Sequence, residues 1–182
     1  MIRSFLAVEI PNAVRDEVAK IINNFSQANY PIRWVNKENL HITLIFLGEI
    51  REDFLDKVNR ALGEATKNCR PFEMNLNGVG AFPSQRTPRI IWIGVKQGQN
   101  EIIELQANIE KSLVKIGYKP EAKKFHPHLT IGRVKGFLKD AIQIFETNYS
   151  SPPFLIKSIV LFQSILRPEG PLYEKLKEFN FG

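Results

Sequence analysis

Hydrophobic positions recur along the chain with two different periods, and each period predicts its own kind of element. Apolar residues three or four apart predict amphipathic helices over 11–25, 54–65 and 102–116. Short apolar or alternating runs predict strands over 2–8, 34–35, 41–47, 72–77, 89–95, 128–134 and 154–166. A shorter helix is expected over 140–146, whereas 172–181 fits either period.

Turn-forming residues mark the ends of these elements. Gly117 is placed to cap the third helix, because glycine adopts the left-handed conformation without strain. The glycines and proline between 78 and 83 predict a bend or loop, and 168–171 predicts a turn. Closely spaced strands favour an α+β fold with antiparallel sheets over a doubly wound parallel sheet. No linker divides the chain, so residues 1–182 are expected to form a single domain.

Two of the expected strands carry the same four-residue pattern. It reads His-Ile-Thr-Leu at 41–44 and His-Leu-Thr-Ile at 128–131, 87 residues later. Alternate residues of a strand face the same side, so each strand projects one imidazole and one hydroxyl together. Only three histidines are present in the chain, and chance is therefore a poor explanation of the repeat.

Two imidazoles facing one cleft suit general acid–base catalysis. A neutral ring takes a proton from the attacking group and a protonated ring gives one to the leaving group, and the ordinary pKa of histidine lies near neutral pH. Threonine hydroxyls can bind phosphoryl oxygens, and a nearby cation can neutralise charge that develops in the transition state. The repeat therefore predicts phosphodiester hydrolysis or transesterification without a metal.

A structural explanation competes with this one for each histidine taken alone. A lone histidine on a strand is more often a hydrogen-bonded structural residue than a catalyst, and it is the matched pair that favours catalysis. His126 precedes His128 by two positions and should share its face, but it lacks a threonine partner and Pro127 follows it. We expect His126 to be structural or supporting.

Positive charge is concentrated in one segment. The chain has a net charge of +6, while eight basic residues and one acidic residue between Lys111 and Lys139 give that segment +7. Such a segment is either a solvated lysine-rich surface or a docking surface for an acidic partner such as nucleic acid. It contains the second histidine pattern, which places the charge beside the candidate chemistry.

Several classes of protein are disfavoured by composition and motifs. A lone Cys69 excludes a disulfide framework and a cysteine-based zinc site, and three histidines make a histidine metal site improbable. No glycine-rich phosphate loop appears, so neither a metal nor a nucleotide cofactor is expected. The absence of a long apolar run and of a signal peptide predicts a cytoplasmic protein away from membranes. Nothing in the sequence signals oligomers, so we expect a monomer.

The two patterns, in their contexts 39–48 and 125–133, resemble the two-histidine phosphoesterase superfamily. Within it, segments 3–8, 78–83, 89–94 and 166–173 resemble the bacterial and archaeal RNA 2',3'-cyclic phosphodiesterases, historically called 2'-5' RNA ligases. The likeness extends over essentially the whole chain. It implies a bilobal α+β fold in which two pseudo-symmetric antiparallel sheets, flanked by helices, face each other across a central cleft.

The resemblance also implies an activity and roles for named residues. The activity is metal-independent hydrolysis of a 2',3'-cyclic phosphate at an RNA end, tRNA fragments included, to a 2'-phosphate, with reversible 2'-5' ligation as a side activity. His128 would be the base that activates water and His41 the acid that protonates the 3'-oxygen, although the reverse assignment stays open. Thr43 and Thr130 would hold non-bridging oxygens, and Arg133 would contact the phosphate.

Two of these assignments conflict with simple strand geometry or have a plain alternative. Arg133 lies five positions after His128, so regular alternation directs it to the opposite face. Either the strand bends at Gly132, or the long side chain reaches around, or Arg133 is only a surface charge. Phe5 either stacks on a base near the cleft or packs in the core of the first strand.

Two other functions remain open at this point. The same chemistry could act on a small cyclic nucleotide or an ADP-ribose cyclic phosphate. Alternatively, the protein could be a non-catalytic RNA-binding module, which the intact pair of histidine patterns argues against.

Overall fold

Two four-stranded antiparallel sheets form the body of the protein. The computed structural model describes residues 1–138, 141–168 and 170–182. Sheet A contains, in spatial order, β10 (Gly170–Asn180), β9 (Ser158–Arg167), β1 (Ile2–Glu9) and β3 (His41–Ile50). Sheet B contains β2 (Ile32–Trp34), β7 (His128–Val134), β6 (Ile90–Val95) and β5 (Leu76–Phe82). A two-stranded sheet pairs β4 (Phe72–Met74) with β8 (Phe154–Ile156).

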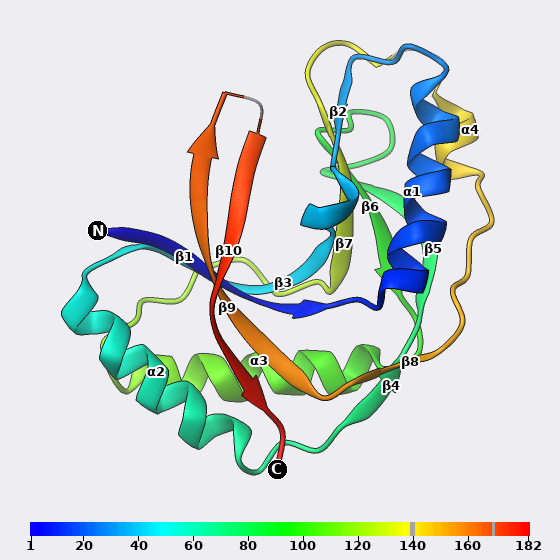
Figure 1. Ribbon diagram of the computed structural model, residues 1–182. Coiled ribbons are helices and arrows are strands. Elements are labelled where there is room, and N and C mark those ends of the chain that lie inside the picture. Colours follow the sequence, from blue (N-terminus) through cyan, green and yellow to red (C-terminus); the bar gives the residue numbers. More distant parts are fainter. Residues whose placement is uncertain (139–140, 169) are drawn as a thin grey trace.

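Helices flank both sheets. They are α1 (Asn12–Ser26), α2 (Glu52–Thr66), α3 (Gln99–Val114) and α4 (Ile142–Phe145), with a short 3₁₀ helix η1 (Lys37–Asn39). Figure 1 shows α2 and α3 side by side next to sheet A, and α1 and α4 beside sheet B. Each long helix buries residues spaced three or four apart, such as Val58 and Leu62 of α2, as its amphipathic sequence predicts.

Gly117 ends α3 in the way expected for a helix cap. Its φ is +101°, in the left-handed region. The amide of Tyr118 donates to the carbonyl of Leu113 at 3.1 Å, and the amide of Gly117 donates to that of Val114 at 3.0 Å. This pair of bonds is the Schellman arrangement, which satisfies carbonyls that a helix end leaves without partners.

One continuous apolar cluster joins the two sheets. It includes Ile42 of β3 and Leu129 of β7, both with no exposed surface. These residues alternate with the histidines and threonines of the two patterns, which are therefore left on the opposite face of each strand. A second, smaller cluster lies on the other face of sheet A and consists of Phe5, Ala7, Val160 and Phe162.

The α+β architecture with two antiparallel sheets is confirmed, and the strands and helices predicted from periodicity are present. One prediction is wrong: the glycine-rich segment after residue 77 is strand β5, not a bend. Gly80 lies against the indole of Trp92, where an added Cβ would stand 2.3 Å from Cη2. Gly78 has a φ of +69° at the point where the register of β5 shifts. Both glycines thus serve the strand itself.

Further boundaries differ from the sequence prediction. The run 72–77 is not one strand, because β4 ends at Met74 and β5 begins at Leu76 in another sheet. The run 154–166 is not one strand, because β8 and β9 separate at Lys157 and join different sheets. The tail that fitted either period is strand β10. The helix expected from 140 spans only Ile142–Phe145 among the described residues. Asp140 of the predicted helix and Glu169 of the predicted turn lie outside the described residues. In the described part of the chain, no helix is long and apolar enough to cross a membrane.

Candidate active site

The two strands that carry the histidine patterns meet where the two sheets approach each other. β3 and β7 are in contact, although they belong to different sheets. A cleft of about 1510 Å³ lies beside them and is lined by residues from both sheets. It is lined by all five polar residues singled out in the sequence, namely His41, Thr43, His128, Thr130 and Arg133.

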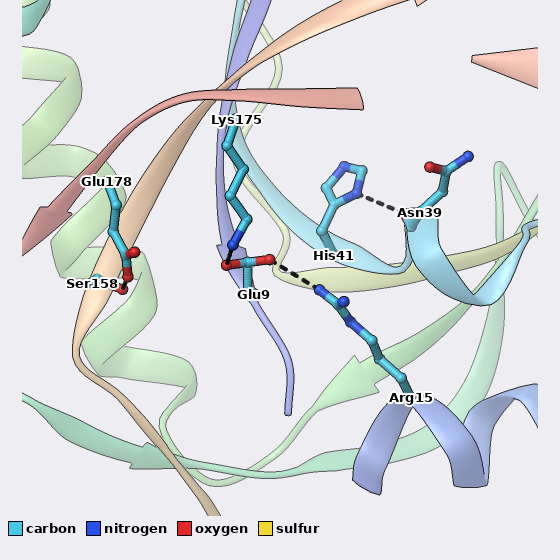
Figure 2. Close-up of polar contacts among 7 residues, drawn as sticks. All are labelled: Glu9, Arg15, Asn39, His41, Ser158, Lys175 and Glu178. Atoms are coloured by element: carbon cyan, nitrogen blue, oxygen red, sulfur yellow. Dashed lines mark hydrogen bonds and ion pairs between the residues drawn. The ribbon is translucent and has the colours of Figure 1, made fainter. Parts of the chain in front are cut away.

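Each catalytic candidate is held by the backbone two residues before it. Nδ1 of His41 lies 2.7 Å from the carbonyl oxygen of Asn39 (Figure 2), and Nδ1 of His128 lies 2.6 Å from that of His126. A carbonyl oxygen only accepts, so Nδ1–H donates in both rings. Each neutral ring therefore has its unprotonated nitrogen at Nε2, the atom left for chemistry.

The two rings differ in what Nε2 contacts. Nε2 of His41 lies 3.0 Å from Oγ1 of Thr43, so the Thr43 hydroxyl donates to the neutral ring. No corresponding bond joins His128 to Thr130 among the described residues. The hydroxyl of Thr130 is thus available to a ligand, whereas that of Thr43 is engaged while His41 is neutral.

Aromatic rings pack around both histidines. Phe5 stacks on His41 with ring centroids 4.9 Å apart, and Tyr173 of β10 meets the same ring edge-on at 5.2 Å. On the other side of the cleft, Phe82 meets His128 edge-on at 5.0 Å. These contacts restrict both rings to the orientation that the carbonyls set.

Phe5 is a core residue rather than a base platform. Only 3% of its surface is exposed, and it lies against His41 and Phe162, with the Phe162 centroid 5.3 Å away. The His41 and Phe162 centroids are themselves 6.1 Å apart, so these two rings crowd the same side of Phe5 and leave little of it exposed where it lines the cleft. Of the two positions expected for Phe5, the structure supports the core of the first strand, and its proposed base-stacking role does not fit.

Burial keeps both histidines neutral in the free protein. It lowers the pKa of His41 to about 4, against the opposing effect of the Asn39 carbonyl. Burial also lowers the pKa of His128, against the opposing effect of the His126 carbonyl, and Arg133 makes a smaller contribution in the same direction as burial. The Arg133 guanidinium lines the same cleft and lowers the pKa of both histidines.

A carboxylate stands on the His41 side of the cleft. Glu9 is the register partner of His41 on the neighbouring strand. It forms ion pairs with Arg15 at 3.2 Å and with Lys175 at 2.6 Å (Figure 2). Glu9 raises the pKa of His41, although burial dominates and Arg15 opposes the carboxylate. Among the described residues, no carboxylate affects the pKa of His128 in this way.

A β-bulge explains why Arg133 faces the cleft. Thr130 pairs with Trp92 of β6, but Gly132 pairs with the next residue, Ile91, so Ile131 is an extra residue in β7. A bulge resets the alternation, which returns Arg133 to the face of Thr130. The strand therefore departs from regular geometry next to Gly132. Of the three explanations offered for Arg133 from the sequence, this is the first, an irregularity of the strand at Gly132.

The same bulge occurs after the first histidine pattern. Thr43 pairs with Ala7 and Ile45 with Leu6, so Leu44 is the extra residue in β3. Phe46 therefore occupies in β3 the place that Arg133 occupies in β7. Its side chain lines the cleft and is 54% exposed. Among the described residues that line the cleft, Leu166 is the only other large apolar residue with an exposed side chain.

Regular alternation along the strand predicts Phe46 in the core with Ile42 and Leu44, and this prediction is wrong, because Phe46 lines the cleft. The available signal was its position, five residues after the first histidine, which matches that of Arg133 after the second. Nor did sequence reasoning show where Tyr173 lies relative to the cleft, which it lines. Tyr173 lies in the β9–β10 hairpin, which is tied to the loop before β3 because the Asn39 side-chain amide donates to the Pro171 carbonyl at 2.9 Å.

The basic segment divides into two parts. Four of its residues line the cleft, namely Lys123, Lys124, Arg133 and Lys135. Lys111 and Lys115 lie instead at the end of α3, and Lys139 is outside the described residues. The predicted accumulation of positive charge beside the second pattern is thus present in part. No group of three or more metal-ligating side chains occurs among the described residues.

Comparison with known proteins agrees with the duplicated architecture. The family model for LigT-like phosphoesterases matches the chain twice, at 8–92 and 93–173, with one histidine pattern in each match. The "RNA 2',3'-cyclic phosphodiesterase" of Archaeoglobus fulgidus is 39% identical over 98% of this chain and 99% of its own. That of Methanocaldococcus jannaschii is 38% identical over 97% and 99%.

Solved structures show the same fold. The crystal structure of TT0787 from Thermus thermophilus aligns with a TM-score of 0.85 and 24% identity, covering 99% of this chain and 98% of that one. Together, the two family matches and the full-length relatives establish that the chain belongs to the LigT-like phosphoesterase family.

Proposed function

We propose that the protein hydrolyses 2',3'-cyclic phosphate ends of RNA to 2'-phosphates. One observation carries this proposal: two imidazoles, each fixed through Nδ1 by a backbone carbonyl, line a single cleft together with Arg133. The names of the full-length relatives support RNA as the substrate. Both patterns come from one chain, so we propose that a monomer is active as a single domain of 1–182.

In the proposed step, Nε2 of His128 removes a proton from water and the water oxygen bonds to phosphorus. The bond from phosphorus to the 3'-oxygen breaks, and protonated Nε2 of His41 gives its proton to that oxygen, which leaves a 2'-phosphate. One difference between the rings supports this assignment: Glu9 favours a proton on His41 and no described carboxylate does so for His128, whereas Arg133 disfavours a proton on both rings.

In this proposal, the charge of the bound substrate raises the pKa of His41, which is too low in the free protein for an acid. His41 is neutral at pH 7 because burial lowers its pKa to about 4, and an acid must carry a proton. A phosphate anion beside the ring raises that pKa. A protonated Nε2 no longer accepts from Thr43, so the Thr43 hydroxyl is released to donate to a phosphoryl oxygen. Protonation of His41 and phosphate binding by Thr43 are thereby coupled.

The remaining cleft residues hold the anion and the nucleoside. Thr130 and Arg133 follow His128 on the same face of β7, and we assign them to the non-bridging oxygens. Phe46 offers an exposed ring in the same cleft, and we assign it the base-stacking role first considered for Phe5. A 5'-hydroxyl in place of water would reverse the step and form a 2'-5' linkage, which accounts for ligation as a side activity.

The size of the cleft favours RNA over a small cyclic nucleotide or an ADP-ribose cyclic phosphate. At about 1510 Å³ it exceeds the roughly 300–1,000 Å³ of ordinary small-molecule pockets. Relative rates on a cyclic mononucleotide and on an oligonucleotide distinguish the two substrates.

The proposal is tested by product analysis. An RNA oligonucleotide with a 2',3'-cyclic end is incubated with the protein in the presence of a chelator, and the product ends are separated by chromatography. We expect a 2'-phosphate. Tight binding without any turnover would identify a binding module instead, and a 3'-phosphate would show that the departing oxygen is misassigned.

A further inference from the structure

A second hollow opens beside the active-site cleft and has no role in the step above. It encloses about 400 Å³ and is formed by the loop before β6 and the segment after β7. We call it the outer pocket and define it by Arg86, Arg89, Lys135 and Phe137. The amide of Val134 donates to the carbonyl of Arg89 at 3.0 Å, which joins the two segments that build it.

The outer pocket adjoins the cleft. Arg89 and Lys135 line both hollows. Along β7 and the residue beyond it, the cleft is lined successively by His128, Thr130, Arg133 and Lys135. The order runs from the proposed reacting phosphate through one cation to the next, so a chain bound at His128 can extend directly into the outer pocket.

The outer pocket has the composition of a single-strand binding surface. Arg86, Arg89 and Lys135 are exposed, and none of them forms an ion pair with any residue that the structure describes. No acidic residue is among the residues that line it. Phe137 beside these cations is 87% exposed, more than any other described large apolar side chain. Unpaired cations beside an open aromatic ring are typical of sites that bind phosphates and stack bases.

The loop that carries Arg86 is held in place locally. The amide of Thr87 donates to Oγ of Ser84 at 3.3 Å, and the two hydroxyls are 3.1 Å apart. Pro88 next to them is buried. The position of Arg86 is therefore set by the loop before any ligand binds, which lowers the entropic cost of binding.

We infer that the outer pocket binds the RNA strand upstream of the cyclic end. Phosphates of the preceding nucleotides contact Arg86, Arg89 and Lys135, and one upstream base stacks on Phe137. This inference rests on the proposed function and extends it, since it makes the enzyme selective for a chain over a mononucleotide. It adds contacts away from the reacting atoms, so it affects binding of longer substrates only.

The test compares kcat/KM on a 2',3'-cyclic mononucleotide with that on a pentanucleotide carrying the same cyclic end. The wild-type protein should prefer the pentanucleotide. Arg86→Ala and Phe137→Ala should each reduce kcat/KM on the pentanucleotide by about tenfold, within the range for loss of a base-stacking or phosphate contact, and leave the mononucleotide rate unchanged. Arg60→Ala on α2 and Leu155→Ala on β8, both at exposed sites, are the matched controls.

Salt dependence separates the two kinds of contact. Arg86→Ala should reduce the slope of log Kd against log salt by about 1 for a pentanucleotide with a 2'-phosphate end, and Phe137→Ala should leave the slope unchanged. Binding equal to wild type in both variants overturns the inference, whether or not the protein is catalytic. Equal losses on mononucleotide and pentanucleotide also overturn it. Failure of the wild type to hydrolyse either substrate overturns the proposed function instead.

Discussion

The strands β3 and β7 have the same framework and different chemistry. In both, a carbonyl two residues earlier holds Nδ1 of a histidine, a threonine follows on the same face, and a bulge comes directly after the threonine. After the bulge, β3 presents the apolar ring of Phe46 and β7 presents the cation of Arg133. The duplicated family match indicates that the framework itself is repeated.

The differences between the two strands divide the chemistry between them. His41 is packed against Phe5 and accepts from Thr43, and Glu9 is nearby. Arg133 lowers the pKa of both rings, but no described carboxylate raises that of His128. A symmetric frame thus brings two imidazoles to one cleft, and we propose that the asymmetric surroundings determine which ring carries the proton.

The largest loss of activity is expected when either imidazole is removed. His41→Ala and His128→Ala should each reduce kcat/KM by about 10²–10⁴-fold, the usual contribution of a general acid or base. His126→Ala, a matched histidine control on the same side of the cleft, should lose far less. Steady-state rates on a cyclic-ended oligonucleotide check this, and full activity in both variants would sink the assignment.

The next largest effect concerns the two residues after the bulges. Arg133→Ala should reduce kcat/KM by about 10²–10³-fold, as expected for loss of a group that stabilises transition-state charge. Phe46→Ala should raise KM by about tenfold with little change in kcat, because stacking holds substrate and transition state alike. The measurement is a full set of kcat and KM values for both variants.

Exchanging these two residues tests whether the position of the cation matters. A Phe46→Arg, Arg133→Phe double variant should remain as slow as Arg133→Ala, because the cation then follows His41 and Thr43 on β3 and no longer stands beside Thr130 on β7. Recovery of wild-type kcat in the exchanged protein would show that the position of the cation does not matter, contrary to the asymmetry described above.

A smaller effect is expected on stability at acid pH. The pKa of His41 falls from 6.5 in the unfolded chain to about 4 in the folded protein, so the unfolded state binds more protons as the pH falls below 6.5. Between pH 7 and pH 4, His41→Gln should therefore lose about 3 kcal/mol less free energy of unfolding than wild type. His128→Gln should also reduce the loss, because its pKa is lowered too. Urea unfolding at both pH values measures this, and parallel curves for all three proteins would contradict it.

Local sequence patterns predicted the elements and the pairing of each histidine with its threonine. Helical and strand periods are properties of neighbouring residues, and so is the shared face of His41 and Thr43. The direction of Arg133 depends instead on how β7 pairs with β6, since the bulge at Ile131 is visible only in the register. Regular alternation could not show it.

Partners distant in sequence explain the other departures. Phe5 is covered by His41 and by Phe162 of β9, so its burial could not be read from the first strand alone. Gly80 marks a strand rather than a loop because the Trp92 indole of the neighbouring strand occupies the space of a side chain. Tertiary packing decided both cases.

The division of roles between the two histidines is tested most directly with a substrate whose bridging 3'-oxygen is replaced by sulfur. A thiolate departs without protonation, so this substrate does not need the acid. On it, His41→Ala should regain a kcat/KM within about tenfold of wild type, whereas His128→Ala should stay reduced by about 10²-fold or more. Rescue of His128→Ala with continued loss in His41→Ala would contradict the account, because the acid would then be His128.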